Sequence, residues 1–486
     1  MDCYIGNKGY TIYKKSITDK ELLTIKETLT VSPYSPMTIS KPPVFPVYRE
    51  NNDKIYIPRF IGNDMFGIPI NNKLKKPDSV YIPFKGEVRD YQTTIIDTFM
   101  ENASQGLGGG LLEIPCGRGK TVMALNIISQ LKTKTLVIVH KGFLLNQWVE
   151  RIQQFLPTAR IGTIQGKTVD VDDKDIVLGM LQSISMKDYP KNIFDSFGLT
   201  IIDEVHHIAA EVFVRSLFKV VSPTMLGLSA TMNRKDGLSF VFKMFIGPVI
   251  YKEKREANHD VLVKAYHYET DDQDFNDVIL DYRGNPAYSS MISKLCNYEP
   301  RSEFIISILR ELINNDTGGK TQIIVLAQNR SVLNHIYDSI LKEGFSTVGY
   351  YLGGMKEQHL KASEDKQIII GTYSMASEAL DIKSLTTLLM VTPKTSIEQS
   401  VGRILRTRHS QPLVIDIVDQ HDLFRRQFKK RMAFYKKNKY RVIESISHSP
   451  YQWNTIYDAK EIIKKDKSST RREPFTNKCC IELSSL

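Results

Sequence analysis

Residues 109–131, GGLLEIPCGRGKTVMALNIISQL, combine the residue types that a phosphate-binding site needs. The pattern predicts a strand, a tight loop with two glycines, and a helix that begins at Lys120. Small loop residues let backbone N–H groups approach an anion in front of a helix N-terminus. Lys120 can reach the β- and γ-phosphates of a nucleotide, and the Thr121 hydroxyl can ligate Mg²⁺. Ile114 replaces the first glycine of the strict motif, so a chance match on a core helix remains the alternative.

A second chemical signature is the segment LTIIDEVHH, residues 199–207. Asp203 and Glu204 end an apolar strand, which is where the side chains of an open α/β sheet meet a ligand. Asp203 suits the Mg²⁺ shell, and Glu204 suits a general base that orients and deprotonates an attacking water. The alternative is a solvated acidic strand end. The order of the two signatures along the chain favours a site that hydrolyses ATP.

Two arginines could complete such a site. Arg403 and Arg406 lie three residues apart, so one face of a helix carries both. They can reach across a cleft to phosphate oxygens on a facing domain and stabilise the charge that develops at the γ-phosphate. The alternative is a pair of surface arginines. Closure of the cleft on ATP would assemble the site, and hydrolysis would release it.

Short apolar runs alternate with amphipathic helices from about residue 88 onward, and these elements must position the candidate residues. Such runs are typical of buried parallel strands in α/β layers. They fall into two blocks, each of the size of one doubly wound domain. The first block holds LLEIP, TLVIVH, DIVLGM, LTIIDE and MLGLSA, and the second holds TQIIVLA, STVGYYL, QIIIGT, TLLMVT and PLVIDIV.

The rest of the chain differs in composition from these two blocks. The N-terminal residues hold nine of the 20 prolines and predict one helix, with a capping box between Thr18 and Glu21. The expected parts are a small N-terminal α+β domain (1–85), a first α/β domain (86–251), a linker or insertion (252–303), a second α/β domain (304–445) and a charged tail (446–486).

The charge of the chain favours a polyanionic partner. It has 65 Lys and Arg against 54 Asp and Glu, a net charge of +11, and a pI near 9.1. This balance favours nucleic acid over a membrane surface, with a solubilising excess of lysine as the alternative. The five cysteines form neither a metal-binding pattern nor a disulfide framework. With no signal peptide and no transmembrane run either, we expect a soluble intracellular protein.

The tetrapeptide DEVH, residues 203–206, resembles the DExH box of superfamily 2 helicases. In that family the phosphate loop is commonly P-C-G-x-G-K-T, which matches residues 115–121 and removes the anomaly at Ile114. The other family motifs are matched in order by RDYQ from Arg89 (the adenine-reading Q motif), LQSIS from Leu181 (motif Ic), LGLSATMNRKDG from Leu226 (motif III), GTYSMASEALDI from Gly371 (motif V) and QSVGRILR from Gln399 (motif VI).

The resemblance implies an α/β fold with two tandem RecA-like domains that bind ATP and Mg²⁺ between them. Within the superfamily, the motifs look most like the XPB/UvsW branch and the compact helicases of large DNA viruses, of the poxvirus transcript-release type. The implied catalytic residues are Lys120, Asp203, Glu204, Gln399, Arg403 and Arg406. The implied nucleotide contacts are Arg89, Gln92, Pro115, Cys116, Gly117, Arg118, Gly119, Lys120, Thr121 and Asp381, with Mg²⁺ held by Thr121 and Asp203. The implied coupling residues are Ser229, Ala230 and Thr231.

The same resemblance places a nucleic-acid strand across both domains. The implied contacts are Lys141, Gln182, Ser183, Gln328, Asn329, Arg330 and Thr372. Backbone contacts of this kind hold a strand without reading its sequence. Two residues depart from the family pattern: Lys235 replaces the glutamate of an Arg-Glu-Asp element, and Ala379 replaces the usual glycine of motif V. A special unwinding role for the first element is therefore in doubt.

Residues 421–440 predict a helix with one apolar and one basic face. Phe424, Phe428, Met432 and Tyr435 follow helical spacing, and the segment holds eight Lys and Arg against one Asp. The basic face is either a solvated surface or a phosphate-tracking one. The segment between motifs V and VI is too short for a strand-separating wedge. Any wedge or duplex grip is therefore expected from residues 1–85 or from the 252–303 insertion.

The sequence thus predicts an ATP-dependent helicase or translocase, with 3′-to-5′ movement on DNA in preference to RNA. The expected roles are transcript release or work on replication and repair intermediates. We expect a monomer with RNA polymerase or replication and transcription proteins as partners and, if the chain is viral, a location in the virion or a cytoplasmic virus factory. The alternatives are a duplex translocase that displaces polymerase without unwinding, an RNA helicase, an inactive nucleic-acid-binding scaffold, and a nuclease with a helicase motor.

Overall fold

The computed structural model shows two compact units, Met1–Arg255 and Glu256–Leu486, and each is described by itself. The described residues are 1–34, 43–105, 108–115, 117–190, 192–207, 210–234, 236–253, 260–316, 318–319, 321–378, 380, 382–405 and 411–460. Among these residues, no helix has the length and hydropathy that a bilayer-spanning segment requires.

The first unit begins with a small antiparallel sheet. Its strands, in spatial order, are β1 (Cys3–Gly6), β2 (Gly9–Tyr13), β6 (Lys54–Ile57) and β5 (Arg49–Glu50). Helix α1 (Asp19–Thr28) begins at the predicted capping box, because the Thr18 hydroxyl accepts from the Glu21 N–H and the Glu21 carboxylate accepts from the Thr18 N–H. The domain also contains η1 (Lys14–Ser16), the paired strands β3 (Thr30–Val31) and β4 (Phe45–Pro46), and α2 (Arg59–Phe66).

The first large sheet has eight strands, and every neighbouring pair except β10–β9 is parallel. The five strands predicted for the first α/β block are all present in it. In spatial order the strands are β10 (Thr168–Asp170), β9 (Ile161–Gln165), β11 (Ile176–Met180), β8 (Thr135–Val139), β12 (Leu199–Asp203), β13 (Thr224–Ser229), β7 (Gly109–Glu113) and β14 (Val249–Lys252).

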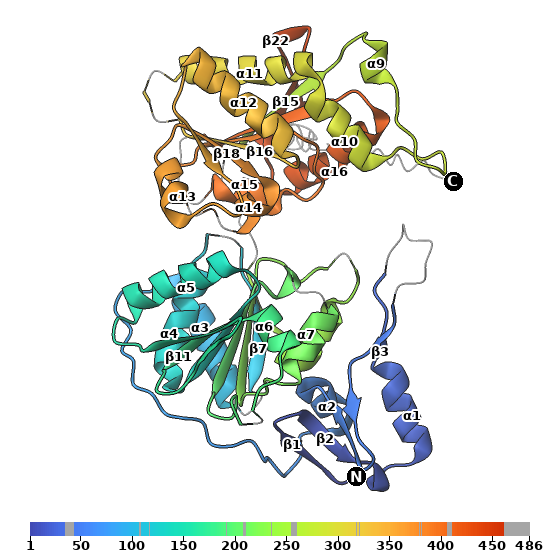
Figure 1. The fold of residues 1–486 in the computed structure, drawn as a ribbon, viewed down its shortest axis with the longest axis vertical. Coiled ribbons are helices and arrows are strands. Elements are labelled where there is room, and N and C mark those ends of the chain that lie inside the picture. The colour runs from blue at the N-terminus through green and yellow to red at the C-terminus, as the bar shows by residue number, and fades with distance from the viewer. Residues whose placement is uncertain are drawn as a thin grey trace, which may run out of the picture. The chain divides into compact units, whose positions relative to one another are not determined.

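Helices cover both faces of this sheet (Figure 1). One face carries α3 (Asp90–Ser104), α4 (Lys120–Leu131) and α5 (Gly142–Phe155). The other carries α6 (Leu181–Met186), α7 (Ala210–Leu217) and α8 (Ser239–Ile246), and η2 (Val205–His207) follows β12. Alternate residues of β8 enter two different hydrophobic clusters, Val137 and Val139 on the α3–α5 side, Leu136 and Ile138 on the other. Burial on both faces explains why such strands read as unbroken apolar runs.

The small N-terminal domain is anchored to this α/β layer. The buried Arg59 guanidinium donates to the carbonyl oxygens of Gly108, Ser222 and Pro223 at 2.7, 3.2 and 2.8 Å. Apolar residues of the small sheet and of α7 and α8 also belong to one continuous hydrophobic cluster. The N-terminal domain and the first α/β domain therefore form a single compact unit.

The second unit contains a second eight-stranded sheet, in which only the last pair, β21–β22, is antiparallel. The five strands predicted for the second α/β block are β16 to β20. In spatial order the strands are β17 (Val348–Tyr351), β18 (Ile368–Thr372), β16 (Ile323–Ala327), β19 (Thr387–Met390), β20 (Leu413–Asp419), β15 (Leu262–Tyr268), β21 (Arg441–Ile446) and β22 (Ser449–Tyr457).

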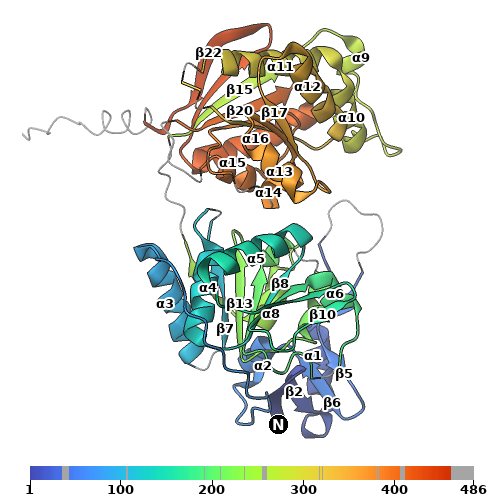
Figure 2. The same ribbon diagram turned by 60° about the vertical axis from the view of Figure 1, so that its left-hand side comes forward.

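The predicted linker or insertion at 252–303 is wrong for most of its length. Strand β15 pairs in parallel with both β20 and β21 and so lies inside the second sheet (Figure 2). It was not recognised because Lys264 and His267 interrupt its apolar pattern. These polar side chains are accommodated by Trp453, whose ring lies 5.0 Å from the Lys264 ammonium, and by Glu444, 3.1 Å from His267.

The helices of the second unit also revise the predicted boundaries. They are α9 (Gln273–Asn276), α10 (Tyr288–Asn297), α11 (Glu299–Asn314), α12 (Arg330–Glu343), α13 (Glu357–Glu364), α14 (Tyr373–Glu378), α15 (Glu398–Arg403) and α16 (Asp422–Lys437). Helix α10 lies within the predicted linker, and its Met291 and Leu295 are core residues. The predicted tail is wrong for 449–457, which form β22, and its remainder from 461 lies outside the described residues.

The two large sheets share one strand order. If the first strand of each repeat is numbered 1, the orders β11-β8-β12-β13-β7 and β18-β16-β19-β20-β15 both read 3-2-4-5-1. The numbering leaves out β9 and β10 in the first repeat and β17 in the second, all at one edge of their sheets. In the second repeat it works only because β15 is the first strand. The predicted fold of two tandem RecA-like α/β domains with a small N-terminal α+β domain is therefore confirmed.

Candidate nucleotide-binding and nucleic-acid-contacting sites

The phosphate loop links β7 to α4 in the predicted way. Gly119 caps α4 with φ 79° and Gly117 has φ 81°, a backbone conformation that favours glycine. A Cβ atom on Gly119 would lie 2.4 Å from the Gln92 amide nitrogen, so a larger residue would displace the Gln92 side chain. Ile114 is fully buried and its N–H donates to the Ser229 carbonyl at 2.8 Å. The residue that departs from the strict motif is therefore a core residue below the loop.

Residues of the RDYQ segment brace this loop. The Gln92 amide oxygen accepts from the Arg89 N–H at 2.9 Å, and its nitrogen donates to the Arg118 carbonyl at 3.0 Å. The Tyr91 hydroxyl donates to the same carbonyl at 3.2 Å, while the Arg118 guanidinium lies 3.9 Å from the Tyr91 ring centre and pairs with Glu253. Gln92 therefore holds the conformation of the phosphate loop, and its predicted adenine contact remains a prediction.

The two predicted carboxylates lie at the carboxyl end of β12, close to the loop. Lys120 Nζ lies 3.3 Å from Glu204 Oε1, so the structure brings the predicted phosphate ligand and the predicted base together. Asp203 is buried, and its Oδ2 accepts from the Trp148 indole N–H at 2.9 Å. Burial, and next the Glu204 charge, raise the pKa of Asp203 to about 6. Glu204 has a positive φ of 50°, a conformation uncommon for a side-chain-bearing residue and often found at functional sites.

Trp148 is the residue of this site that sequence reasoning missed. It lies in the apolar face of α5, where the helical pattern predicts burial and nothing more. The Asp203 that it contacts is 55 residues away in the chain. Only the packing of α5 against the sheet brings its indole N–H to the carboxylate.

A short hydrogen-bonded relay connects β12 to the predicted coupling segment. His206 Nδ1 lies 2.6 Å from the Ser229 hydroxyl, which donates to the Thr231 carbonyl at 2.6 Å. Arg234 donates to the His206 carbonyl at 3.2 Å and forms an ion pair with Asp236. The Ser-Ala-Thr segment at 229–231 is thus tied to the residues that follow Glu204. A conformational change at Asp203 and Glu204 can reach residues 229–231 through a single side chain, that of His206.

The residues around Lys120 fit ATP and Mg²⁺. The glycine cradle and the α4 N-terminus would hold the phosphates with Lys120, and Asp203 with Thr121 would hold the metal ion. Pro115 begins the loop, and Cys116 lies outside the described residues. Within the described part of the chain, no group of three or more His, Cys, Asp or Glu forms a separate metal site. One carboxylate and one hydroxyl beside a phosphate cradle suit Mg²⁺ that is bound together with a nucleotide.

The predicted motif VI residues lie in the second unit. Gln399 and Arg403 are in α15, where the Arg403 guanidinium is buried and donates to the Leu380 carbonyl at 2.8 Å. Arg406 and Asp381 lie outside the described residues. The roles assigned to these residues therefore remain predictions. In its present contact, Arg403 ties α15 to the segment that follows α14.

The predicted nucleic-acid contacts of the first unit lie at the carboxyl ends of neighbouring strands. Lys141 caps α5 directly after β8, and Gln182 follows the adjacent β11. The Gln182 amide donates to the His140 carbonyl at 3.0 Å, and the Ser183 hydroxyl accepts from the Gly166 N–H at 2.9 Å. The structure thus brings Lys141, at the start of α5, together with Gln182 and Ser183, at the start of α6.

The predicted contacts of the second unit are grouped in the same way. Gln328, Asn329 and Arg330 follow β16, and Thr372 ends the adjacent β18. The Gln328 amide donates to the Tyr288 hydroxyl at 2.9 Å and to the Pro393 carbonyl at 2.8 Å. Tyr288 was placed in the predicted linker, so sequence reasoning did not assign it to this group.

The basic face predicted for residues 421–440 is only partly correct. Phe424, Phe428 and Tyr435 of α16 are buried as predicted. Arg431 was counted with the basic face, yet it is buried and forms an ion pair with Asp416 of β20 at 2.8 Å. Arg431 lies three residues after Phe428 and four before Tyr435, so helical spacing places it on the buried face, and the Asp416 carboxylate there balances its charge. The other basic residues of the helix are exposed.

Several known proteins are similar to this chain. The family model described as type III restriction enzyme, res subunit, matches residues 85–234. The putative ATP-dependent RNA helicase L396 of Acanthamoeba polyphaga mimivirus is 37% identical over 474 residues, which cover 94% of this chain and 90% of the relative. Putative helicase 161L of Invertebrate iridescent virus 6 is 27% identical and covers 80% of this chain and 89% of the relative. The crystal structure of T4 UvsW matches 92% of this chain and 99% of its own at 16% identity, with a TM-score of 0.34.

The mimivirus relative is matched through nearly the whole of both chains. The family-model match spans the phosphate loop, the Asp203–Glu204 pair and the Ser-Ala-Thr segment. The chain therefore belongs to the superfamily 2 helicases of large DNA viruses and is an enzyme of the ATP-dependent helicase class.

Proposed function

We propose that the protein couples hydrolysis of ATP·Mg²⁺ to 3′-to-5′ movement on DNA, and that it serves transcript release or the remodelling of replication and repair intermediates. The observation that carries this proposal is the grouping of Lys120, Asp203 and Glu204 beside one glycine cradle. Candidate protein partners are RNA polymerase and replication or transcription proteins.

Each residue of the group has a distinct chemical task in this proposal. Asp203 and Thr121 hold Mg²⁺, which neutralises phosphate charge when it is bound. Lys120 leaves Glu204 to bind the β- and γ-phosphates, which frees the Glu204 carboxylate to accept a proton from the attacking water. The relay from His206 to Ser229 then carries the change at this carboxylate to the coupling segment.

RNA is the second candidate substrate. The mimivirus relative is named an RNA helicase, and its identity with this chain is 37%. The contacts proposed here, Lys141, Gln182 and Ser183 in the first unit and Gln328 to Arg330 and Thr372 in the second, suit a sugar–phosphate backbone. Backbone contacts alone do not select between the two polymers unless they reach the 2′-hydroxyl.

Steady-state ATPase activity with no nucleic acid, single-stranded DNA, duplex DNA and RNA tests the proposal. We expect DNA to stimulate turnover more than RNA, and a tailed duplex to be unwound only when its single strand permits 3′-to-5′ entry. Stronger stimulation of ATPase activity by RNA than by DNA would indicate an RNA helicase instead. Displacement of a stalled polymerase without strand separation would favour a duplex translocase. Absence of ATPase activity in all four conditions would contradict the motor and leave the binding scaffold.

Replacing Trp148 with phenylalanine should raise the Mg²⁺ concentration for half-maximal ATPase activity by about 10- to 100-fold, since residues that orient a metal ligand have effects of this size. The ring is retained, but the buried Asp203 loses its indole donor. A Mg²⁺ titration of ATPase activity, together with binding of a fluorescent ATP analogue with and without Mg²⁺, measures the change.

The matched control is Trp453→Phe, because Trp148 and Trp453 are the two tryptophans of the chain and Trp453 lies in the other unit. In the Trp453→Phe protein, Trp148 is the sole tryptophan and its fluorescence reports on the Asp203 environment. An unchanged Mg²⁺ requirement in Trp148→Phe would show that the indole does not position the metal ligand.

A further inference from the structure

The outer face of the N-terminal sheet differs in chemistry from the inner one. Because neighbouring residues of a strand point to opposite faces, Ile5, Tyr10 and Ile12 form the inner face with the core. The outer face carries the side chains that alternate with these, which are Tyr4, Thr11, Tyr13, Lys54 and Tyr56; Thr11 and Tyr56 are buried, and the other three are half-buried. The side chains that the central strands present on this face thus include no carboxylate.

Lysine ammonium groups lie over the tyrosine rings of this face. Lys54 Nζ is 4.6 Å from the Tyr13 ring centre and 5.4 Å from that of Tyr4, whose hydroxyl accepts from it at 3.3 Å. Lys73 Nζ lies 4.1 Å from the Tyr4 ring centre. Lys8 and Lys15 add similar contacts with Tyr56 and Tyr13, at 4.7 and 5.8 Å. We call these four lysines and three tyrosines the Lys–Tyr face.

The lysines of this face are not neutralised by acids within the described part of the chain. Other lysines of the same domain do form ion pairs with an acid. Glu50 pairs with both Lys14 and Lys26, at 2.6 and 2.8 Å. Residues 1–85 hold 13 Lys and Arg against 8 Asp and Glu, so this domain carries +5 of the net +11 of the chain. Positive charge is therefore concentrated in the N-terminal domain. The lysines of the Lys–Tyr face carry a part of this charge, and no acid among the described residues pairs with them.

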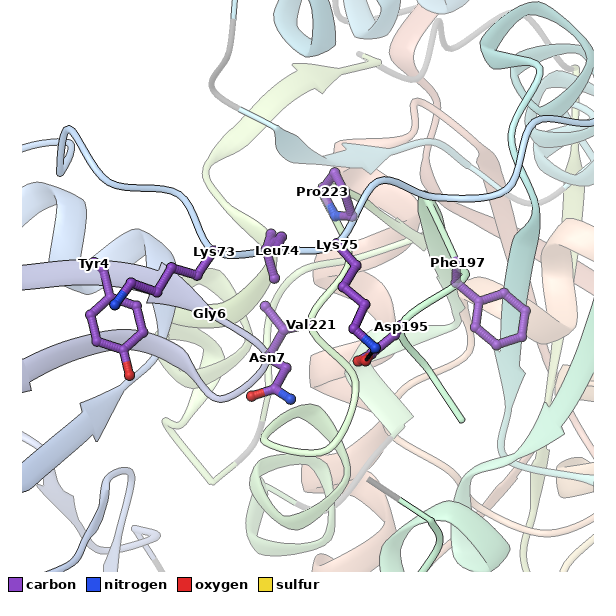
Figure 3. A pocket seen from close by; sticks show the side chains of 10 residues that line it. All are labelled: Tyr4, Gly6, Asn7, Lys73, Leu74, Lys75, Asp195, Phe197, Val221 and Pro223. Carbon is purple, nitrogen blue, oxygen red and sulfur yellow. Dashed lines mark ion pairs between the residues drawn. The ribbon is translucent and has the colours of Figure 1, made fainter. Parts of the chain in front are cut away.

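The segment that leaves the domain extends this face. The Ile5 N–H donates to the Asn71 carbonyl at 3.1 Å and the Lys73 N–H donates to the Ile5 carbonyl at 2.7 Å, so residues 71–73 run beside β1. A hollow of about 230 Å³ adjoins Lys73 (Figure 3). It is lined on one side by Tyr4 and Asn7, and Lys75 reaches Asp195 at its other side, 2.8 Å away.

The size of the hollow argues against a small-molecule site. Pockets for drug-sized ligands commonly have about 300–1,000 Å³ and are mostly apolar. This hollow is smaller and carries polar groups, which suits one local contact with an extended ligand. Five neighbouring backbone segments at about 4.8 Å spacing make the whole face about 20 Å wide, the length of about six base pairs.

We propose that the Lys–Tyr face is a second nucleic-acid-binding surface, which grips the sugar–phosphate backbone of the substrate outside the two RecA-like domains. The ligand chemistry is a regular row of phosphates, for which ammonium groups are general partners. The rings hold the ammonium groups in place, at about 0.5–1 kcal/mol each for exposed cation–π contacts, so less side-chain freedom is lost on binding. This inference rests on the proposed function, since it assigns a further contact for the same nucleic acid.

The double variant Lys54→Ala/Lys73→Ala of the full chain tests this surface. Counterion release from one phosphate contact contributes about eightfold to affinity at about 0.1 M salt, so we expect the two substitutions to weaken binding by about 10- to 60-fold. The slope of log K against log salt should fall by about two. Fluorescence anisotropy with labelled single-stranded DNA, duplex DNA and RNA measures both quantities. ATPase activity without nucleic acid should stay at the wild-type level, since neither lysine is near the phosphate loop.

Two further variants keep the test decisive. Lys14→Ala/Lys26→Ala removes the same charge from the same domain at residues that form ion pairs with Glu50, and it should change affinity less than threefold. Lys54→Arg/Lys73→Arg keeps both charges and should bind nearly as well as wild type. Equal loss in the two alanine variants, loss in the arginine variant, or wild-type affinity and salt slope in Lys54→Ala/Lys73→Ala would each overturn the inference. Failure of the proposed function is a different result, because the wild-type chain itself would then lack nucleic-acid-stimulated ATPase activity.

Discussion

Replacing Glu204 with glutamine should reduce the rate of ATP hydrolysis by about 10²- to 10⁴-fold, the usual contribution of a positioned general base. The amide has the same shape as the carboxylate but cannot accept a proton from water. Nucleotide binding should be retained or tightened, because Lys120 loses the ion pair of 3.3 Å that competes with phosphate. Single-turnover hydrolysis and the affinity for a fluorescent ATP analogue separate the two effects.

Glu211→Gln provides the control for this experiment. Glu211 is an exposed residue of α7 in the same unit, so its replacement makes the same chemical change away from the phosphate loop. We expect wild-type turnover in this variant. If the Glu204→Gln variant keeps ATP turnover within threefold of wild type, Glu204 is not the general base. Another group must then activate the water.

Replacing Arg301 with leucine should destabilise the second unit by about 3–5 kcal/mol, the usual cost of leaving a buried charge without its partner. The side chains of Arg301 and Asp419 are both 0% exposed, and the guanidinium forms an ion pair with Asp419 and donates to the Val391 carbonyl at 2.7 Å. The variant would leave the Asp419 carboxylate in the core without its partner. Urea unfolding followed by Trp453 fluorescence in a Trp148→Phe background reports on this unit alone.

The same helix offers a matched comparison. Arg310 of α11 also forms an ion pair, with Glu343, but the two side chains are 42% and 33% exposed. Arg310→Leu should cost no more than about 1 kcal/mol, because water screens an exposed pair. The double variant Arg301→Leu/Asp419→Leu should recover much of the lost stability, since it removes the unpaired charge. Equal unfolding midpoints for the two single variants would contradict a structural role for the buried pair.

The local chemistry of the nucleotide site could be predicted from the sequence. A glycine loop before a helix with Lys120 at its start is a feature of consecutive residues, and so is a carboxylate pair at the end of an apolar strand. The ten strands predicted for the two α/β blocks all lie in the large sheets, because residues buried on both faces must be apolar throughout. The resemblance of the motifs to superfamily 2 helicases supplied the family.

Other features could not be predicted, because they depend on which distant residues become neighbours. Strand β15 mixes apolar residues with Lys264 and His267 and reads as a linker, yet β20 and β21 pair with it on both sides. Arg431 shares the helical face of Phe428 and Tyr435, but its charge alone suggests an exposed position; the buried partner, Asp416 on β20, is 15 residues away in the chain.

The sequence by itself determined which residues are candidates for the chemistry of ATP hydrolysis and which runs form strands, since both depend on side-chain type and short spacing. Only the tertiary structure decided that Trp148 donates to Asp203, that His206 contacts Ser229, and that lysines of the N-terminal domain gather over tyrosine rings. These contacts join segments that are far apart in the chain. They form because strand order and helix packing, which no local pattern encodes, place the segments side by side.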